Sequence, residues 1–194
     1  MKICMMTNTY LPHVGGVARS VDTFARQYEK LVHEVLIVAP TFDGEKERDG
    51  NVVRIPSIQN FNGSDFSVRL PLPVSLDRRL REFDADIYHS HHPFLLGDNA
   101  LRRARDQGNP LVFTHHTLYE RYTHYVLRDA RTLEHLAIEL ATQYANLCDH
   151  VIAPSLSVAR LLERRGVRTP VTEIPTGVDI DFFAGADGAA FRER

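Results

Sequence analysis

Short apolar runs alternate with helical patterns along the whole chain, and this alternation is the feature that most constrains its fold. The runs are nearly continuous in Ile, Val and Leu, as in strands buried on both faces of a parallel sheet. The pattern therefore predicts an α/β domain with an open parallel sheet and helices on both faces. The predicted strands are Lys2–Thr7, Glu34–Ala39, Val52–Ile55, Asp86–His89, Leu111–Thr114, His150–Ala153 and Val171–Ile174.

Apolar residues between these runs recur at spacings of three and four, which predicts helices with one buried stripe. Residues 56–73 break the pattern with Asn, Gly and Ser among aromatic and aliphatic residues, and we interpret them as a loop or hairpin beside the sheet. The three clearest stripes are Val17, Val21, Phe24, Tyr28 and Leu31; Leu76, Leu80 and Phe83; and Leu133, Leu136, Leu140 and Leu147.

Composition places the chain among globular domains and excludes several classes of function. The 194 residues suffice for one domain or slightly more, and 43% of them are hydrophobic. A net charge of −2 offers no bulk attraction for nucleic acid. The two cysteines, Cys4 and Cys148, lie far apart in apolar surroundings, unlike a secreted disulfide scaffold. With no signal-peptide pattern and no apolar run near 20 residues, we expect a cytoplasmic location.

Ligands of open parallel sheets bind beyond the carboxyl ends of the strands, and the loop after the first predicted strand carries a glycine pair there. Gly15 and Gly16 open the first helix, where exposed N–H groups and the helix dipole favour an anion such as phosphate. The alternative is that the pair only makes a tight turn. Neither dinucleotide nor P-loop glycine spacing is present, which disfavours a nicotinamide dehydrogenase and a P-loop NTPase.

Five of the ten histidines follow two neighbouring predicted strands: His89, His91, His92, His115 and His116. Histidine is suited to acid–base chemistry, hydrogen bonding or metal binding. Because side chains alternate along a strand, His89 and His91 should point to one face of the sheet and His92 to the other. His115 and His116 should likewise point to opposite faces. Since no carboxylate adjoins the first three, we predict no metal site. Buried hydrogen bonds are the alternative role, above all for His89 and His115.

Serine or cysteine nucleophiles are poorly supported, because the chain has no G-x-S-x-G turn and neither cysteine stands at a cationic helix start that would lower its pKa. Six sequence blocks, by contrast, stand in a specific order: 1–17, 33–40, 86–97, 114–122, 148–155 and 174–183. Together they resemble the retaining glycosyltransferases of family four, formerly called group 1. The motifs are most similar to those of enzymes that glucosylate diacylglycerol or mannosylate phosphatidylinositol.

The resemblance implies the N-terminal, acceptor-binding half of a GT-B enzyme, in which two Rossmann-like domains face each other across a cleft. It places this domain at residues 1–183 and the start of a linker at 184–194, with the C-terminal donor-binding domain absent from the chain. The implied donor is a nucleotide-diphosphate sugar, with no cofactor. A hexose would pass to an acceptor such as a glycerolipid or inositol lipid, and the isolated domain would be inactive.

The resemblance implies roles for the residues that match the family's motifs. Gly15 and Gly16 would approach the donor diphosphate, and His116 would reach the transferred sugar near its reacting carbon as the catalytic residue. His91, Thr117 and Tyr119 would bind the acceptor. Retention in this family is explained by front-face attack, in which the leaving phosphate helps to deprotonate the acceptor and no protein nucleophile is needed.

A lipid acceptor would call for a membrane-facing surface, peripheral on the inner face of the membrane. Arginines interleave with the apolar stripe of residues 76–83 and follow Leu101, as in helices that dock on anionic lipid. The alternative is an ordinary solvated face. Two other functions stay open: a freestanding module that binds a sugar, lipid or phosphate, and a metal-dependent hydrolase built on the histidines. The arginines are Arg78, Arg79, Arg81, Arg102, Arg103 and Arg105.

Overall fold

A seven-stranded parallel sheet forms the centre of the molecule, with strand order β3-β2-β1-β6-β7-β8-β9. The computed structural model describes residues 1–42, 50–58, 68–69, 74–118, 130–178, 180, 184 and 192. All seven predicted strands are confirmed, with ends that shift by at most one residue. They are β1 (Lys2–Met6), β2 (Glu34–Pro40), β3 (Val52–Ile55), β6 (Ile87–Ser90), β7 (Leu111–Thr114), β8 (His150–Ala153) and β9 (Val171–Glu173).

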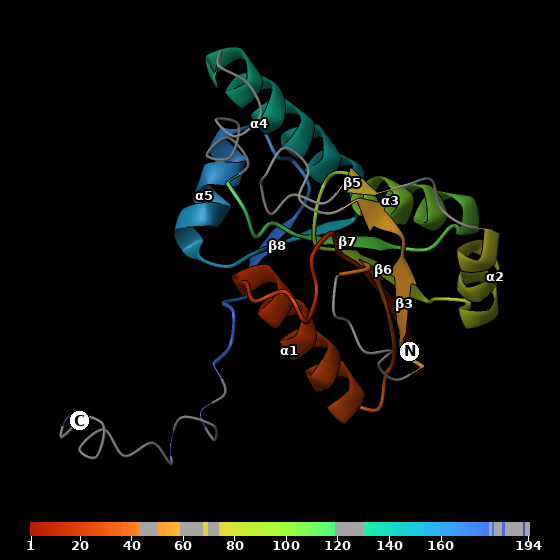
Figure 1. Cartoon of the computed structure of the whole chain (residues 1–194). Helices are drawn as coiled ribbons and strands as arrows, with labels where there is room; N and C mark the ends of the chain where they lie inside the picture. Colours follow the sequence, from red (N-terminus) through yellow and green to blue (C-terminus); the bar gives the residue numbers. More distant parts are fainter. Residues whose placement is uncertain are drawn as a thin grey trace.

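Helices cover both faces of the sheet, as predicted. One hydrophobic core joins the sheet to α2, α3, α4 and α5, and a second joins the opposite face to α1. Figure 1 shows α1 beneath the sheet and α3 and α4 above it. The structure is thus a Rossmann-like doubly wound domain. The helices are α1 (Gly16–Lys30), α2 (Val74–Phe83), α3 (Leu96–Gln107), α4 (Ala130–Leu147) and α5 (Leu156–Arg164).

The strand order reverses at β1, which pairs with β2 on one side and with β6 on the other. The helices that follow β1 and β6 therefore lie on opposite faces of the sheet, and the loops that lead to them leave the sheet side by side. Cys4, Met5 and Met6 are inaccessible to solvent at this position. The topology thus locates the candidate site before any side chain is considered.

The irregular segment contains a short antiparallel pair, β4 (Ser57–Ile58) with β5 (Val68–Arg69). Ser57 faces Arg69 and Ile58 faces Val68. The hairpin interpretation of this segment is confirmed for these two strands. Residues 59–67 and 70–73 lie outside the described part of the chain.

Helix α4 buries a different face from the one that its leucines predicted. Leu136, Leu140 and Leu147 are about half exposed, at 52%, 47% and 47%. The helix packs instead through small residues such as Ala145, which let it approach the sheet closely. Tyr144 reaches into the core and donates a hydrogen bond to the Gly97 carbonyl over 2.9 Å. Side-chain volume, rather than leucine spacing, selected the buried face.

The start of α3 is fixed by the loop that follows β1. The Asn8 Oδ1 atom accepts a hydrogen bond from the Leu96 amide at 3.1 Å, and its Nδ2 donates to the Phe94 carbonyl at 3.0 Å. Gly97 lies so close to the preceding loop that an added Cβ would stand 1.9 Å from the His92 carbonyl oxygen. The glycine is therefore required by a close approach of two backbones.

We predict that Gly97→Ala destabilises the domain by about 2–4 kcal/mol or prevents folding, because backbone cannot yield as a flexible side chain can. The measurement is the free energy of unfolding from urea titration. Gly16→Ala is the matched control, since a Cβ at that position meets no atom within 4 Å. Equal stability of the two variants would contradict the close approach.

Candidate functional site

The loop between β1 and α1 is held in place by residues from α1 and β3. The Tyr10 hydroxyl donates to Asp22 Oδ1 of α1 at 3.0 Å. The Arg54 guanidinium of β3 lies 5.4 Å from the centroid of the Tyr10 ring. It donates to the carbonyls of Leu11 at 2.6 Å and Pro40 at 3.0 Å. These contacts fix the loop at Tyr10 and Leu11, a few residues before its glycine pair.

The N-terminus of α1 offers uncapped backbone N–H groups. Gly15 is the N-cap residue, in extended conformation, and no side chain among the described residues caps it. The first turn carries no acidic residue that would repel an anion. A Cβ on Gly15 would lie 3.2 Å from His13 Nε2, whereas one on Gly16 would point into open space. This end of α1 therefore has the charge and the room that an anionic group requires.

Three histidines from β6 and the end of β7 form a packed row. His91 Nδ1 lies 2.9 Å from His116 Nε2, and the two rings stack with their centroids 5.2 Å apart. The His89 ring lies 4.1 Å from that of His91. Phe24 of α1 packs against both, at 5.6 and 6.2 Å. His116 is the member of the row that retains some solvent exposure.

The other two histidines have structural contacts. His92 Nδ1 accepts a hydrogen bond from the Asn8 amide at 3.1 Å, which ties the β6 loop to the β1 loop. His115 is buried with its ring edge-on to Phe113, away from His116. His89 Nε2 is bonded to Thr114 Oγ1 over 2.7 Å. The divergence along both strand ends is confirmed, and so is the buried hydrogen bond expected of His89.

Burial keeps the histidine row uncharged. It lowers the pKa of His89 to about 3 and that of His92 to about 3, with His116 as a smaller cause in each. The pKa of His116 falls to about 4, first through burial and then through His115. Burial, then the neighbouring histidines, hold the pKa of His91 well below its ordinary range. At neutral pH these side chains therefore exchange hydrogen bonds as neutral imidazoles.

The structure brings most of the predicted site residues to one edge of the sheet. Gly15 and Gly16 follow β1, while His116 and the partly exposed Thr117 follow β7. Tyr119 lies outside the described residues. His91 departs from its expected role: it is fully buried behind His116, and a direct contact with an acceptor does not fit that position.

Sequence reasoning missed Asn8 and Arg54, which hold the two site loops. The position of Asn8 could have identified it, because it directly follows the first predicted strand, where loop residues contact a ligand or a neighbouring loop. The position of Arg54 could not, since its partners at Tyr10, Leu11 and Pro40 are set by the order of strands in the sheet.

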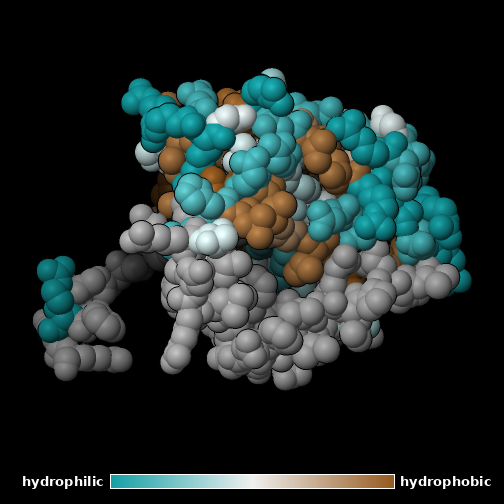
Figure 2. All heavy atoms as spheres, turned by 90° about the horizontal axis from the view of Figure 1, so that it is seen from above, coloured by the Kyte–Doolittle hydropathy of each residue, from teal (hydrophilic) through white to brown (hydrophobic). Residues whose placement is uncertain are grey.

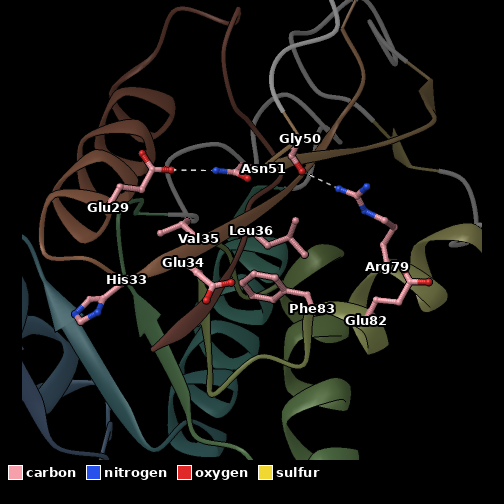
Figure 3. A pocket seen from close by; sticks show the side chains of 10 residues that line it. All are labelled: Glu29, His33, Glu34, Val35, Leu36, Gly50, Asn51, Arg79, Glu82 and Phe83. Atoms are coloured by element: carbon pink, nitrogen blue, oxygen red, sulfur yellow. Dashed lines mark hydrogen bonds between the residues drawn. The ribbon is translucent and has the colours of Figure 1, made fainter.

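A cavity of about 450 Å³ lies at the opposite, amino-terminal edge of the sheet. Figure 3 shows its lining, with Arg79 donating to the Gly50 carbonyl and Asn51 donating to Glu29. Glu34 at the start of β2 and Phe83 at the end of α2 also line it. Because it lies beyond the amino ends of the strands, we do not assign the site there.

The arginine-bearing helices use their apolar residues in the core. Leu76 and Leu80 of α2 are almost completely buried, so these two leucines are not available for insertion into a bilayer. Arg103 forms an ion pair with Asp77, and Arg105 donates to the Leu147 carbonyl at 2.9 Å. Within the described residues, no helix has the length and apolarity to cross a membrane.

Two further features bear on the expected chemistry. Cys4 and Cys148 are both free and buried, and burial raises the pKa of each thiol far above neutrality. Neither is thus an activated nucleophile. In the part of the chain that the structure describes, no group of three or more His, Cys, Asp or Glu side chains is arranged to hold a metal ion.

Comparison with known proteins identifies relatives over nearly the whole chain. The family model described as Glycosyltransferase Family 4 matches residues 14–182. Alpha-monoglucosyldiacylglycerol synthase of Streptococcus pneumoniae is 32% identical over 94% of this chain and 42% of its own. GDP-mannose-dependent alpha-mannosyltransferase of Corynebacterium glutamicum is 27% identical over 100% of this chain and 47% of its own. The chain thus spans less than half the length of these relatives.

A solved structure supports the fold. Anabaena HepE, crystallised in complex with UDP-glucose, superposes with a TM-score of 0.63 at 16% sequence identity. The match covers 100% of this chain and 48% of the HepE chain. The similarity at this identity is one of fold: the doubly wound domain corresponds to about half of the HepE chain, a structure of the GT-B type.

The buried histidines predict that stability falls with pH below neutrality. The unfolded chain binds protons near the ordinary histidine pKa of 6.5, whereas the folded chain resists them until about pH 4 or lower. Stability is therefore full above about pH 6.5 and is lost as the pH drops. Each extra proton bound on unfolding adds about 1.4 kcal/mol per pH unit to the slope.

Urea titration between pH 5 and 6.5 measures this slope. We expect the wild-type slope to correspond to several protons, and His116→Gln to reduce it by up to one. A free energy of unfolding that is flat across this range would contradict burial of neutral histidines.

Proposed function

The chain belongs to Glycosyltransferase Family 4, and on that premise we propose that it is the acceptor-binding half of a retaining hexosyltransferase. The donor is a nucleotide-diphosphate sugar, bound largely by a C-terminal domain of the same enzyme. The fraction of each relative that this chain covers, 42% and 47%, supports a second half of similar size. We assign residues 1–183 to the acceptor domain and 184–194 to the start of the linker.

The observation that carries the proposal is the placement of two features on one edge of the sheet. The uncapped start of α1 follows β1, and His116 follows β7. One strand, β6, separates these two strands, so the strands that lead to the two features lie about 10 Å apart. A sugar joined to a diphosphate is long enough to bridge loops that leave the sheet at this spacing.

The proposed chemistry uses these features in sequence. As the bond between sugar and diphosphate breaks, negative charge grows on the departing phosphate, and the N–H groups at Gly16 and the next residues stabilise it. The acceptor hydroxyl attacks from the same face, and its proton passes to the leaving phosphate. Neutral His116 contacts the transferred sugar beside the reacting carbon, and Thr117 contacts the acceptor. The reaction uses no cofactor and no protein nucleophile.

For the acceptor we propose a glycerolipid or inositol lipid, met at the inner face of the membrane by a cytoplasmic enzyme. The similarity to the pneumococcal alpha-monoglucosyldiacylglycerol synthase supports the lipid class. Figure 2 looks down on the side where α4 lies and shows apolar side chains scattered among hydrophilic ones. Contact with a membrane would therefore rely on individual exposed groups, such as Arg78 and Arg102, rather than on an inserted helix.

We predict that Gly16→Val lowers kcat/KM for the nucleotide sugar about 100-fold in the enzyme with both halves, because a side chain there occupies the space that the diphosphate needs. Transfer from labelled UDP-glucose or GDP-mannose to diacylglycerol vesicles measures the rate. Gly50→Val is the matched control: its Cβ also meets open space, at the other edge of the sheet.

The 194-residue chain alone supplies the baseline of this assay and should transfer no sugar. Robust transfer by the single half would overturn the two-half proposal. Equal rates for Gly16→Val and Gly50→Val would remove the α1 N-terminus from the donor site. Binding of ligand by both halves without transfer would favour a binding module.

A further inference from the structure

A single proton links His91 to His116. The two facing nitrogens, His91 Nδ1 and His116 Nε2, are 2.9 Å apart, so one must carry hydrogen and the other must accept. Both side chains are neutral at pH 7 because burial disfavours the imidazolium. Each ring thus carries one proton, and the direction of this hydrogen bond fixes the tautomers of both.

The other nitrogen of His91 decides the direction. Nε2 of His91 is buried and has no hydrogen-bond partner among the described residues. Its ring is completely inaccessible to solvent and lies against those of His89 and Phe24. If His116 donated, His91 would carry its proton on Nε2, as a buried N–H without an acceptor. Orphaned buried N–H groups are rarer than acceptors with a spare lone pair, so donation by His91 Nδ1 is favoured.

We infer that His91 is a positioning residue that holds His116 in the tautomer protonated on Nδ1, so that His116 meets the substrate as a hydrogen-bond donor. The hydrogen bond occupies the lone pair of His116 Nε2, and the remaining ring nitrogen carries the N–H. Packing by Phe24 and His89 restrains the His91 ring, and hence the orientation of its partner.

This inference deepens the proposed function and rests on it for its catalytic meaning. A donor beside the reacting carbon binds an oxygen of the transferred sugar but does not remove the proton of the acceptor hydroxyl. His116 therefore orients the sugar and polarises one of its oxygens, and the leaving phosphate remains the base. A histidine free to change tautomer would divide its population between a donor and an acceptor.

The tautomer is measurable without any substrate. In the 194-residue chain labelled with ¹⁵N histidine, long-range ¹H–¹⁵N correlation spectra at pH 7 distinguish a protonated Nδ1 from a protonated Nε2. We expect both His91 and His116 to be protonated on Nδ1. A wild-type His116 protonated on Nε2 would overturn the inference, whatever the variants do.

Two substitutions of His91 separate donation from packing. An Asn side chain places an amide nitrogen near the position of Nδ1, so His91→Asn should preserve the His116 tautomer. His91→Leu fills comparable space without a donor, so no hydrogen bond fixes the His116 ring, which can turn toward solvent and should populate both tautomers. Thermal unfolding verifies that each variant is folded. An unchanged His116 tautomer in folded His91→Leu would contradict control by His91.

Kinetics in the enzyme with both halves test the consequence. His91→Leu should lower kcat at least tenfold and leave the KM for UDP-glucose or GDP-mannose within about threefold, and His91→Asn should recover most of the rate. Equal loss in both variants would indicate a merely structural residue and overturn the inference. Failure of the wild-type enzyme to transfer sugar would instead reject the proposed function, and the spectra would still report the tautomers.

Discussion

The reversal of strand order at β1 is the constraint on which the rest of the structure depends. β1 pairs with β2 on one side and with β6 on the other, and helices cover both of its faces. Its loop therefore leaves the sheet beside that of β6. Asn8 then joins the two loops by capping the start of α3. The glycine pair and the histidine row stand at one edge because this junction brings them there.

Much of the polarity at this edge lies beneath the surface. His91 and its neighbours are neutral, hydrogen-bonded and packed on Phe24, so the group that meets solvent, His116, rests on an ordered support. Such a buried polar row costs stability when it is protonated and gives orientation when it is neutral. The candidate site combines backbone N–H groups at the start of α1 with the side chain of His116, whose tautomer we infer to be controlled by the buried His91.

The sequence predicted the sheet well because each strand is a nearly continuous apolar run, a local signal that tertiary contacts only reinforce. Gly15, Gly16 and His116 stand in loops that follow such runs, so the sequence could place them at one edge of the sheet, while their roles stay predictions taken from the family resemblance. Periodicity predicted the wrong face of α4, where the small Ala145 packs more closely than Leu140 can. The orientation of His91 toward His116 depends on the register between β6 and β7, which no local pattern encodes.

We propose that the edge formed by α1 and His116 receives the nucleotide sugar. A crystal structure of the enzyme with both halves, bound to a non-transferable nucleotide sugar, would locate the ligand. We expect diphosphate oxygens within hydrogen-bond distance of backbone N–H groups in the first turn of α1, and a sugar oxygen in contact with His116 Nδ1. A sugar bound at the opposite edge, or one that accepts no hydrogen bond from His116, would contradict the proposal.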